Sequence, residues 1–235
     1  MWNGKKKAIT FSYDDGVTQD MRLVEIFNKY GIKATFNLNY GLLGTQNRLV
    51  RNGVEISHNK LPLADVCHVY EGHEVAAHTL THPALIQLDD TEIVRQVEED
   101  RLRLSDLVGY EVVGFAYPGG SQYRDERVDR LVREQTGVRY ARGTDTTGGF
   151  AVPHELYHFK GSCYHHPEWE RMWQLGEQFL AASPDEPALF YVWGHAYEFD
   201  IYPERWKAFE EFCRMIGGRE DIFYCTNRQA LLGDV

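Results

Sequence analysis

The chain has 235 residues, a formal net charge of −10 at pH 7 and 43% hydrophobic residues. This length and apolar fraction are typical of one globular domain with a sizeable core. The negative charge argues against a nucleic-acid partner bound through phosphates and against docking on an anionic membrane surface. No segment has the roughly 18 apolar residues of a membrane span or the pattern of a signal peptide, so we expect a cytoplasmic location.

The first elements form a strand-helix-strand unit. Ala8–Phe11 is apolar and β-branched enough to predict a buried strand, a helix is expected over 21–30, and a second strand over 33–38. The stretch 41–72 is less regular, and its Asn52-Gly53 turn signal predicts an insertion with a hairpin near 49–56. We expect this insertion to overhang the functional site.

Strands and helices continue to alternate through the rest of the chain. Strands are predicted over 74–78, 112–117, 140–142, 157–163, 188–193 and 222–225; helices over 91–108, 125–135, 167–182, 203–216 and from Asn227; and a loop over 144–149. This alternation predicts a parallel α/β architecture, and the number of strands suits a barrel. We treat residues 1–235 as a single domain.

Two adjacent carboxylates, Asp14 and Asp15, follow the first predicted strand and precede Gly16. Adjacent negative charges repel each other unless a cation or a shared proton relieves the repulsion. A solvated turn is the ordinary alternative for such a sequence. Ligands bind at the carboxyl ends of the strands in parallel α/β folds. Because other predicted strands also end in polar residues, we favour a functional site for this pair.

His78 and His82 stand four residues apart after another predicted strand. Histidines at this spacing can share one metal ion, although many such pairs are only structural. Because the ends of parallel strands meet on one rim, Asp15, His78 and His82 are predicted to converge. An Asp-His-His set leaves open positions on zinc or a similar divalent ion, as a catalytic site requires.

Three further strand ends carry candidate residues. Tyr117-Pro118-Gly119 offers backbone N–H groups suited to an oxyanion hole, or else is a plain turn. His195 follows the apolar strand that contains Trp193, which makes it a candidate general acid. Arg142 either pairs with Asp14 or forms a surface salt bridge. His165-His166 is interpreted as a surface pair at a helix start.

Taken together, Tyr13-Asp14-Asp15-Gly16, His78-x-x-x-His82, Tyr117-Pro118 and the strand ending in His195 resemble the polysaccharide deacetylases, the NodB-homology or carbohydrate esterase family 4 enzymes. The resemblance implies a distorted (β/α)7 barrel and metal-dependent removal of N- or O-acetyl groups from a carbohydrate. It implies that Asp15, His78 and His82 hold the metal, Zn²⁺ or else Co²⁺ or Ni²⁺. Asp14 is then the general base, the Gly119 N–H holds the oxyanion, and His195 protonates the leaving group.

The sequence departs from the pattern of that family in three places. Phe115 lies where an arginine usually orients the base, so Arg142 is our candidate for that role. Gly119 replaces an aromatic residue that often follows the proline, and Trp193 replaces the leucine that usually lines the acetyl pocket. Two alternatives stay open on the same fold: hydrolysis of a cyclic amide or ureide, and carbohydrate binding without catalysis.

Overall fold

The structure is a computed structural model that describes residues 2–233. Its strands are β1 Lys7–Asp14, β2 Ala34–Leu38, β3 Arg48–Arg51, β4 Val54–Ser57, β5 Glu74–Ala77, β6 Gly114–Ala116, β7 Tyr140–Thr146, β8 Phe159–Gly161, β9 Cys163–Tyr164, β10 Ala188–Gly194 and β11 Ile222–Tyr224. Its α-helices are α1 Asp20–Lys29, α2 Val66–Val69, α3 Asp90–Val108, α4 Glu126–Gln135, α5 Trp169–Ala181, α6 Glu204–Ile216 and α7 Asn227–Leu232.

The main sheet is parallel and has the strand order β8-β7-β6-β5-β2-β1-β10-β9. β8 and β9 are at opposite ends of this order but only Ser162 separates them in the chain, so the sheet curves into a ring. If β8 and β9 are counted as one interrupted strand, the ring has seven strands. The predicted fold, a distorted (β/α)7 barrel, is confirmed.

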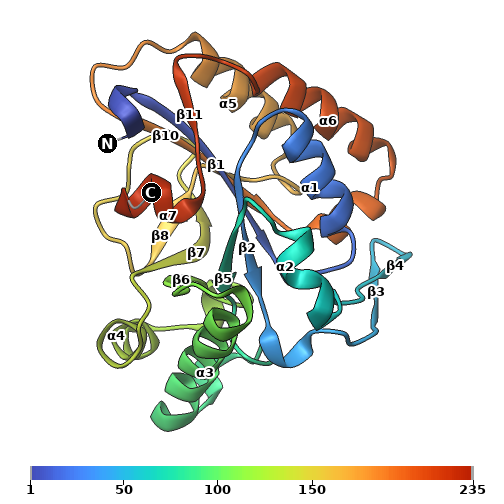
Figure 1. Cartoon of the computed structure of the whole chain (residues 1–235), viewed down its shortest axis with the longest axis vertical. Helices are drawn as coiled ribbons and strands as arrows, with labels where there is room; N and C mark the ends of the chain where they lie inside the picture. Colours follow the sequence, from blue (N-terminus) through green and yellow to red (C-terminus); the bar gives the residue numbers. More distant parts are fainter. Residues whose placement is uncertain (1, 234–235) are drawn as a thin grey trace.

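The remaining edge of β1 is divided between two strands, which is one source of the distortion. Residues 11–14 of β1 pair with β2, and residues 7–9 pair with β11. All eight residues of β1 are buried, because strands flank it on both edges and side chains cover both of its faces. Figure 1 shows α1, α5 and α6 grouped on one side of the sheet and α3 and α4 at another.

The predicted hairpin is present as β3 and β4, which pair antiparallel around a two-residue turn. Asn52 and Gly53 both have positive φ, 51° and 77°, as a tight hairpin turn of this kind requires. Figure 1 shows the hairpin projecting at the edge of the molecule. The chain after it returns to the barrel, where Lys60 forms an antiparallel bridge with Val17 just beyond β1.

Two predictions about local structure were wrong. The loop expected over 144–149 is partly strand, because β7 continues to Thr146, where it pairs with Gly161. The strand expected over 157–163 is interrupted at Ser162, whose backbone N–H donates to the Tyr191 carbonyl. In both places pairing with a distant segment overrides local composition. No helix among residues 2–233 is long and apolar enough to cross a membrane.

Candidate active site

Polar side chains from several strand ends line one cavity of about 580 Å³. Asp14 ends β1 and Asp15 follows it, His78 follows β5, and His195 follows β10. The parallel strands place these side chains on the same rim of the barrel. The sequence-predicted residues at the cavity wall are Asp14, Asp15, His78, His82, Tyr117, Gly119, Trp193 and His195.

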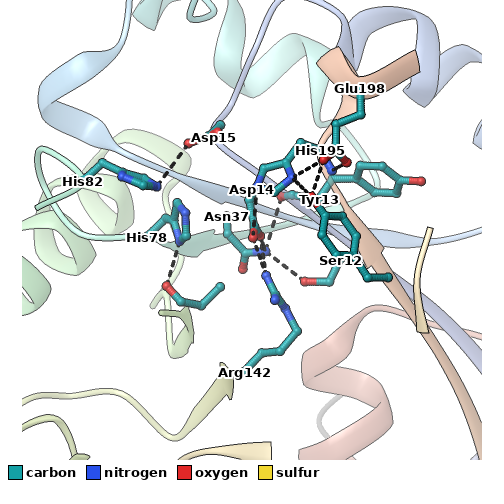
Figure 2. Close-up of polar contacts among 12 residues, drawn as sticks. Ser12, Tyr13, Asp14, Asp15, Asn37, His78, His82, Arg142, His195 and Glu198 are labelled. Carbon is teal, nitrogen blue, oxygen red and sulfur yellow. Dashed lines mark hydrogen bonds and ion pairs between the residues drawn. The ribbon is translucent and has the colours of Figure 1, made fainter. Parts of the chain in front are cut away.

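Asp15, His78 and His82 form a compact group, as Figure 2 shows. Their potential ligand atoms all lie within 4.8 Å of one another, and Asp15 Oδ1 is 3.7 Å from His82 Nε2. Asp15 and His82 both have left-handed backbone, with φ of 84° and 57°. Positive φ is costly for residues other than glycine and concentrates at functional sites. The backbone at this group is therefore strained in a way that positions the three side chains.

One nitrogen of the His78 imidazole is held by a hydrogen bond, and the other points its lone pair at the site without a partner among the described residues. Its Nδ1 lies 2.7 Å from the Ala116 carbonyl, which can only accept, so Nδ1 carries the proton and Nε2 carries a lone pair. Nε2 is buried and has no hydrogen-bond partner among residues 2–233. Burial lowers the pKa of His78 to about 4 and so keeps the ring neutral. Two imidazole nitrogens and a carboxylate fit a zinc-like divalent ion, and an Nδ1–H held by a carbonyl is the usual support for such a ligand.

Asp14 is held by Arg142, which lies behind the cavity wall. Arg142 Nη2 is 2.5 Å from both carboxylate oxygens of Asp14, and Asn37 Nδ2 donates to Oδ1 at 2.8 Å. Burial tends to raise the pKa of Asp14, but the Arg142 guanidinium, with a smaller contribution from the charged His195, lowers the pKa below its ordinary value. The carboxyl is therefore ionised at neutral pH and can accept a proton.

His195 is paired with Glu198, three residues further on. His195 Nδ1 lies 3.4 Å from Glu198 Oε1, and the His195 backbone N–H donates to Oε2 at 3.1 Å. Burial tends to lower the pKa of His195, but the Glu198 carboxylate outweighs this effect and the pKa rises to about 9. His195 Nε2 is 4.0 Å from Asp14 Oδ2, so a charged imidazole faces the ionised carboxylate across the site (Figure 2).

The interpretation of His165 as a surface residue was wrong. Its side chain is 1% exposed, Nε2 lies 3.1 Å from Glu198 Oε2, and Nδ1 is 2.8 Å from the Tyr13 hydroxyl. Tyr164 also binds Glu198 through its hydroxyl. Both residues support the carboxylate that faces His195. Sequence reasoning missed them because their contacts come from β1 and from the segment after β10.

Trp193 and Gly119 shape the two sides of the cavity. The Trp193 ring stacks on Tyr164 with a centroid distance of 4.0 Å, and the Arg142 guanidinium lies 4.4 Å from its centre. Gly119 has φ of 70°, which L side chains rarely adopt, and a Cβ there would lie 2.2 Å from the Tyr123 ring, so a larger residue would require that ring to move. Pro118 lines an adjoining cavity of about 380 Å³, which also includes Gly119 and His82.

Two residues of the site, His58 and Lys60, were not predicted from the sequence, although the insertion that carries them was expected to overhang the site. His58 Nε2 lies 3.1 Å from Asp15 Oδ2, and Lys60 Nζ lies 3.2 Å from Asp15 Oδ1. Burial tends to raise the pKa of Asp15, but Lys60, the His58 hydrogen bond, His195 and His82 together hold the pKa well below its usual range. The signal in the sequence is the polar run after the hairpin, in which a histidine and a lysine stand two residues apart.

Comparisons with known proteins agree with this architecture. The family model described as Polysaccharide deacetylase matches residues 2–141. A Bacillus subtilis (strain 168) protein described as uncharacterized protein YlxY is 26% identical over 117 residues, which are 50% of this chain and 32% of that protein. The chain therefore spans about a third of the length of that relative.

Solved structures share the fold at low sequence identity. The Xyl-CE4 domain of a multidomain xylanase from the hindgut metagenome of Trinervitermes trinervoides is 16% identical, with a TM-score of 0.59 and coverage of 97% of this chain and 91% of that chain. A family 4 carbohydrate esterase from Streptomyces lividans in complex with acetate is 12% identical, with a TM-score of 0.55 and coverage of 94% and 91%. The Streptococcus pyogenes deacetylase PplD is 19% identical, with a TM-score of 0.52 and coverage of 63% and 61%.

Proposed function

The chain belongs to the polysaccharide deacetylase family, and on this premise we propose that it is a metal-dependent hydrolase that removes acetyl groups, above all N-acetyl groups, from a carbohydrate. One observation carries the proposal. The potential ligand atoms of Asp15, His78 and His82 lie within 4.8 Å of one another, beside the ionised Asp14 and the charged His195. We take residues 1–235 as one catalytic domain with an insertion around 41–72.

Asp15, His78 and His82 are the residues that would hold the ion, Zn²⁺ or else Co²⁺ or Ni²⁺. The unpartnered lone pair on His78 Nε2 and the N/O donor set support this assignment. When bound, a divalent ion supplies Lewis acidity, which polarises a carbonyl oxygen and acidifies water. Asp100 supports the group from behind, since it accepts from the backbone N–H of His78 at 2.9 Å.

Asp14 acts as the general base in this proposal. A carboxylate oxygen of Asp14 takes a proton from the water that attacks the acetyl carbon. Arg142 keeps Asp14 ionised and fixes the orientation of the carboxylate, because the guanidinium contacts both oxygens. Asn37 fixes Oδ1 in addition, which leaves Oδ2 as the oxygen that faces His195.

His195 acts as the general acid, and its Nε2 donates a proton to the leaving nitrogen of the sugar. With a pKa of about 9 it is protonated at neutral pH before the reaction begins. The Gly119 backbone N–H donates to the developing oxyanion. Trp193 and Tyr117 border the acetyl group, and the adjoining cavity at Pro118 leaves room for more of the carbohydrate.

The test measures acetate release from a panel of N- and O-acetylated oligosaccharides. Metal-stripped protein is supplied in turn with zinc, cobalt and nickel, and metal content is measured in parallel. We expect Asp15→Ala and His82→Ala to lose both bound metal and acetate release, while His154→Ala, at an exposed position, retains both. Full activity with unchanged metal content in both site variants refutes the proposal. Ring opening of a cyclic amide by metal-free protein supports the rival hydrolase instead.

A further inference from the structure

Lys60 is a buried cation in contact with a carboxylate that we assign to the metal. Its side chain is 4% exposed, and Nζ lies 3.2 Å from Asp15 Oδ1. Nζ makes no hydrogen bond within residues 2–233, so the ion pair is its close polar contact there. The same oxygen is 3.7 Å from His82 Nε2. An ion held between Asp15 and His82 would bind Asp15 Oδ1, and the Lys60 ammonium already contacts that oxygen.

The backbone of Lys60 is fixed beside the site by hydrogen bonds to neighbouring segments. The backbone N–H of Lys60 donates to the Thr45 carbonyl at 2.9 Å. On either side of it, Leu61 donates to Gly16 and Asn59 accepts from Thr18, each at 2.9 Å. The return path of the insertion is thus bonded to the loop that carries Asp15. The positive charge of Lys60 therefore reaches the site from the insertion and not from a strand of the barrel.

We propose that Lys60 competes with a divalent ion for Asp15 and thereby weakens the affinity of the site for metal. The inference rests on the proposed function, because it assumes that Asp15 is a ligand. An ammonium and a dication repel each other strongly at contact distances in a buried site, and both require lone pairs of the same carboxylate. Metal uptake therefore displaces the ammonium from Oδ1, which the flexible four-carbon stem of lysine permits.

His58 provides a useful contrast on the other oxygen of the same carboxylate. Its Nε2 lies 3.1 Å from Asp15 Oδ2, and its ring packs edge-on against Tyr197 at a centroid distance of 4.9 Å. A donor on the second oxygen orients a ligating carboxylate without occupying the first. Removing His58 opens space beside Asp15 but leaves the Lys60 ammonium in place. It therefore separates the effect of the charge from the effect of loosened packing.

The experiment measures the dissociation constant for Co²⁺ on the metal-stripped protein, by the visible absorption of bound cobalt. We expect Lys60→Met and Lys60→Gln to bind Co²⁺ about 10- to 100-fold more tightly than the wild type, the range seen for groups that act on a ligand. Lys60→Arg retains the charge and is expected to stay within a few-fold of the wild type. His58→Ala is expected not to tighten binding. Circular dichroism confirms that each variant is folded. Lys60→Met and Lys60→Gln test the loss of charge with two different neutral side chains.

The outcomes distinguish this inference from the proposed function. Cobalt binding by the wild type with an unchanged or weaker affinity in both neutral variants overturns the role of Lys60 and leaves the metal site intact. Binding by a neutral variant but not by the wild type supports the competition in its strongest form. Absence of binding in every variant overturns the metal site and this inference with it. Equal tightening by His58→Ala and Lys60→Met overturns the charge argument, because loosened packing then accounts for both.

Discussion

Arg142 and Asp14 meet inside the barrel although 128 residues separate them in the chain. Arg142 Nη2 is 2.5 Å from both carboxylate oxygens, and the two side chains are 0% and 3% exposed. Their strands, β7 and β1, are not neighbours in the sheet, so the guanidinium reaches Asp14 across the barrel interior. An arginine from a different strand end thus contacts the carboxylate that we propose as the base.

Arg142→Lys is expected to reduce acetate release at least 100-fold and to shift its pH dependence. Lysine retains a charge but loses the planar fork that contacts both oxygens. The pKa of Asp14, lowered by Arg142 in the wild type, is expected to rise. A general base is lost as pH falls through its pKa, so the acid limb of kcat/KM moves to higher pH. The control Arg133→Lys changes an exposed ion pair with Glu155. An unshifted acid limb in Arg142→Lys contradicts the assignment.

Glu198→Gln is expected to move the alkaline limb of kcat/KM to lower pH. The Glu198 carboxylate is the main group that raises the pKa of His195 to about 9. A general acid is lost as pH rises through its pKa, and a neutral amide no longer stabilises the imidazolium. The shift is expected to be about one pH unit or more. The matched control is Asp200→Asn, whose carboxylate binds Gln19 and Trp206. Nuclear magnetic resonance titration of His195 provides a readout that does not depend on turnover.

Trp193→Leu is expected to enlarge the proposed acyl pocket. Truncating this buried ring removes its stacking on Tyr164 and its contact with Arg142, at a cost of about 1 to 3 kcal/mol in the free energy of unfolding. We expect the ratio of kcat/KM for propionyl over acetyl substrates to rise about tenfold, since one methylene in an apolar pocket has an effect of this size. Trp173→Leu, which loses packing against Phe212 away from the cavity, serves as control. An unchanged ratio places the acyl group elsewhere.

Metal is expected to stabilise the folded chain as well as to support activity. An ion that binds only the native state adds about 2.7 kcal/mol when its concentration is 100 times Kd. For a chain of this size, Tm is expected to rise by several degrees on addition of Co²⁺ to stripped protein. The increase is expected to disappear in Asp15→Ala and after chelation. Thermal unfolding followed by circular dichroism measures it, and an equal increase in Asp15→Ala assigns the metal to another site.

The free energy of unfolding is expected to decrease as pH rises toward 8. Burial raises the pKa of Asp20 to about 8, from 3.8. Between these values the folded state retains a proton that the unfolded state has lost, so stability present at low pH is lost as pH rises through the folded pKa. Asp20→Asn removes a slope of about 1.4 kcal/mol per pH unit. Urea unfolding between pH 5 and 8 measures it. The exposed Asp65→Asn is expected to leave the slope unchanged, and an unchanged slope in Asp20→Asn contradicts the buried-acid explanation.

Local sequence patterns were sufficient to predict the architecture and the placement of the main polar residues. Apolar runs and turn residues identify β1, β5 and β10, and the rule that parallel strands end on one rim brings Asp14, His78 and His195 together. Asn52-Gly53 predicted the hairpin because a tight turn depends on two residues alone. The strands and the turn depend on residues that are close together in the chain, so a single sequence is sufficient to predict them.

Tertiary structure decided what depends on contacts between distant segments. β7 continues through a Thr- and Gly-rich stretch because β8 pairs with it, and His165 is buried because Tyr13 and Glu198 bind it. Lys60 reaches Asp15 because the insertion returns along the loop after β1. Composition specifies that a lysine is present but not which carboxylate it faces, since an ion pair across 45 residues depends on the path of the whole intervening chain.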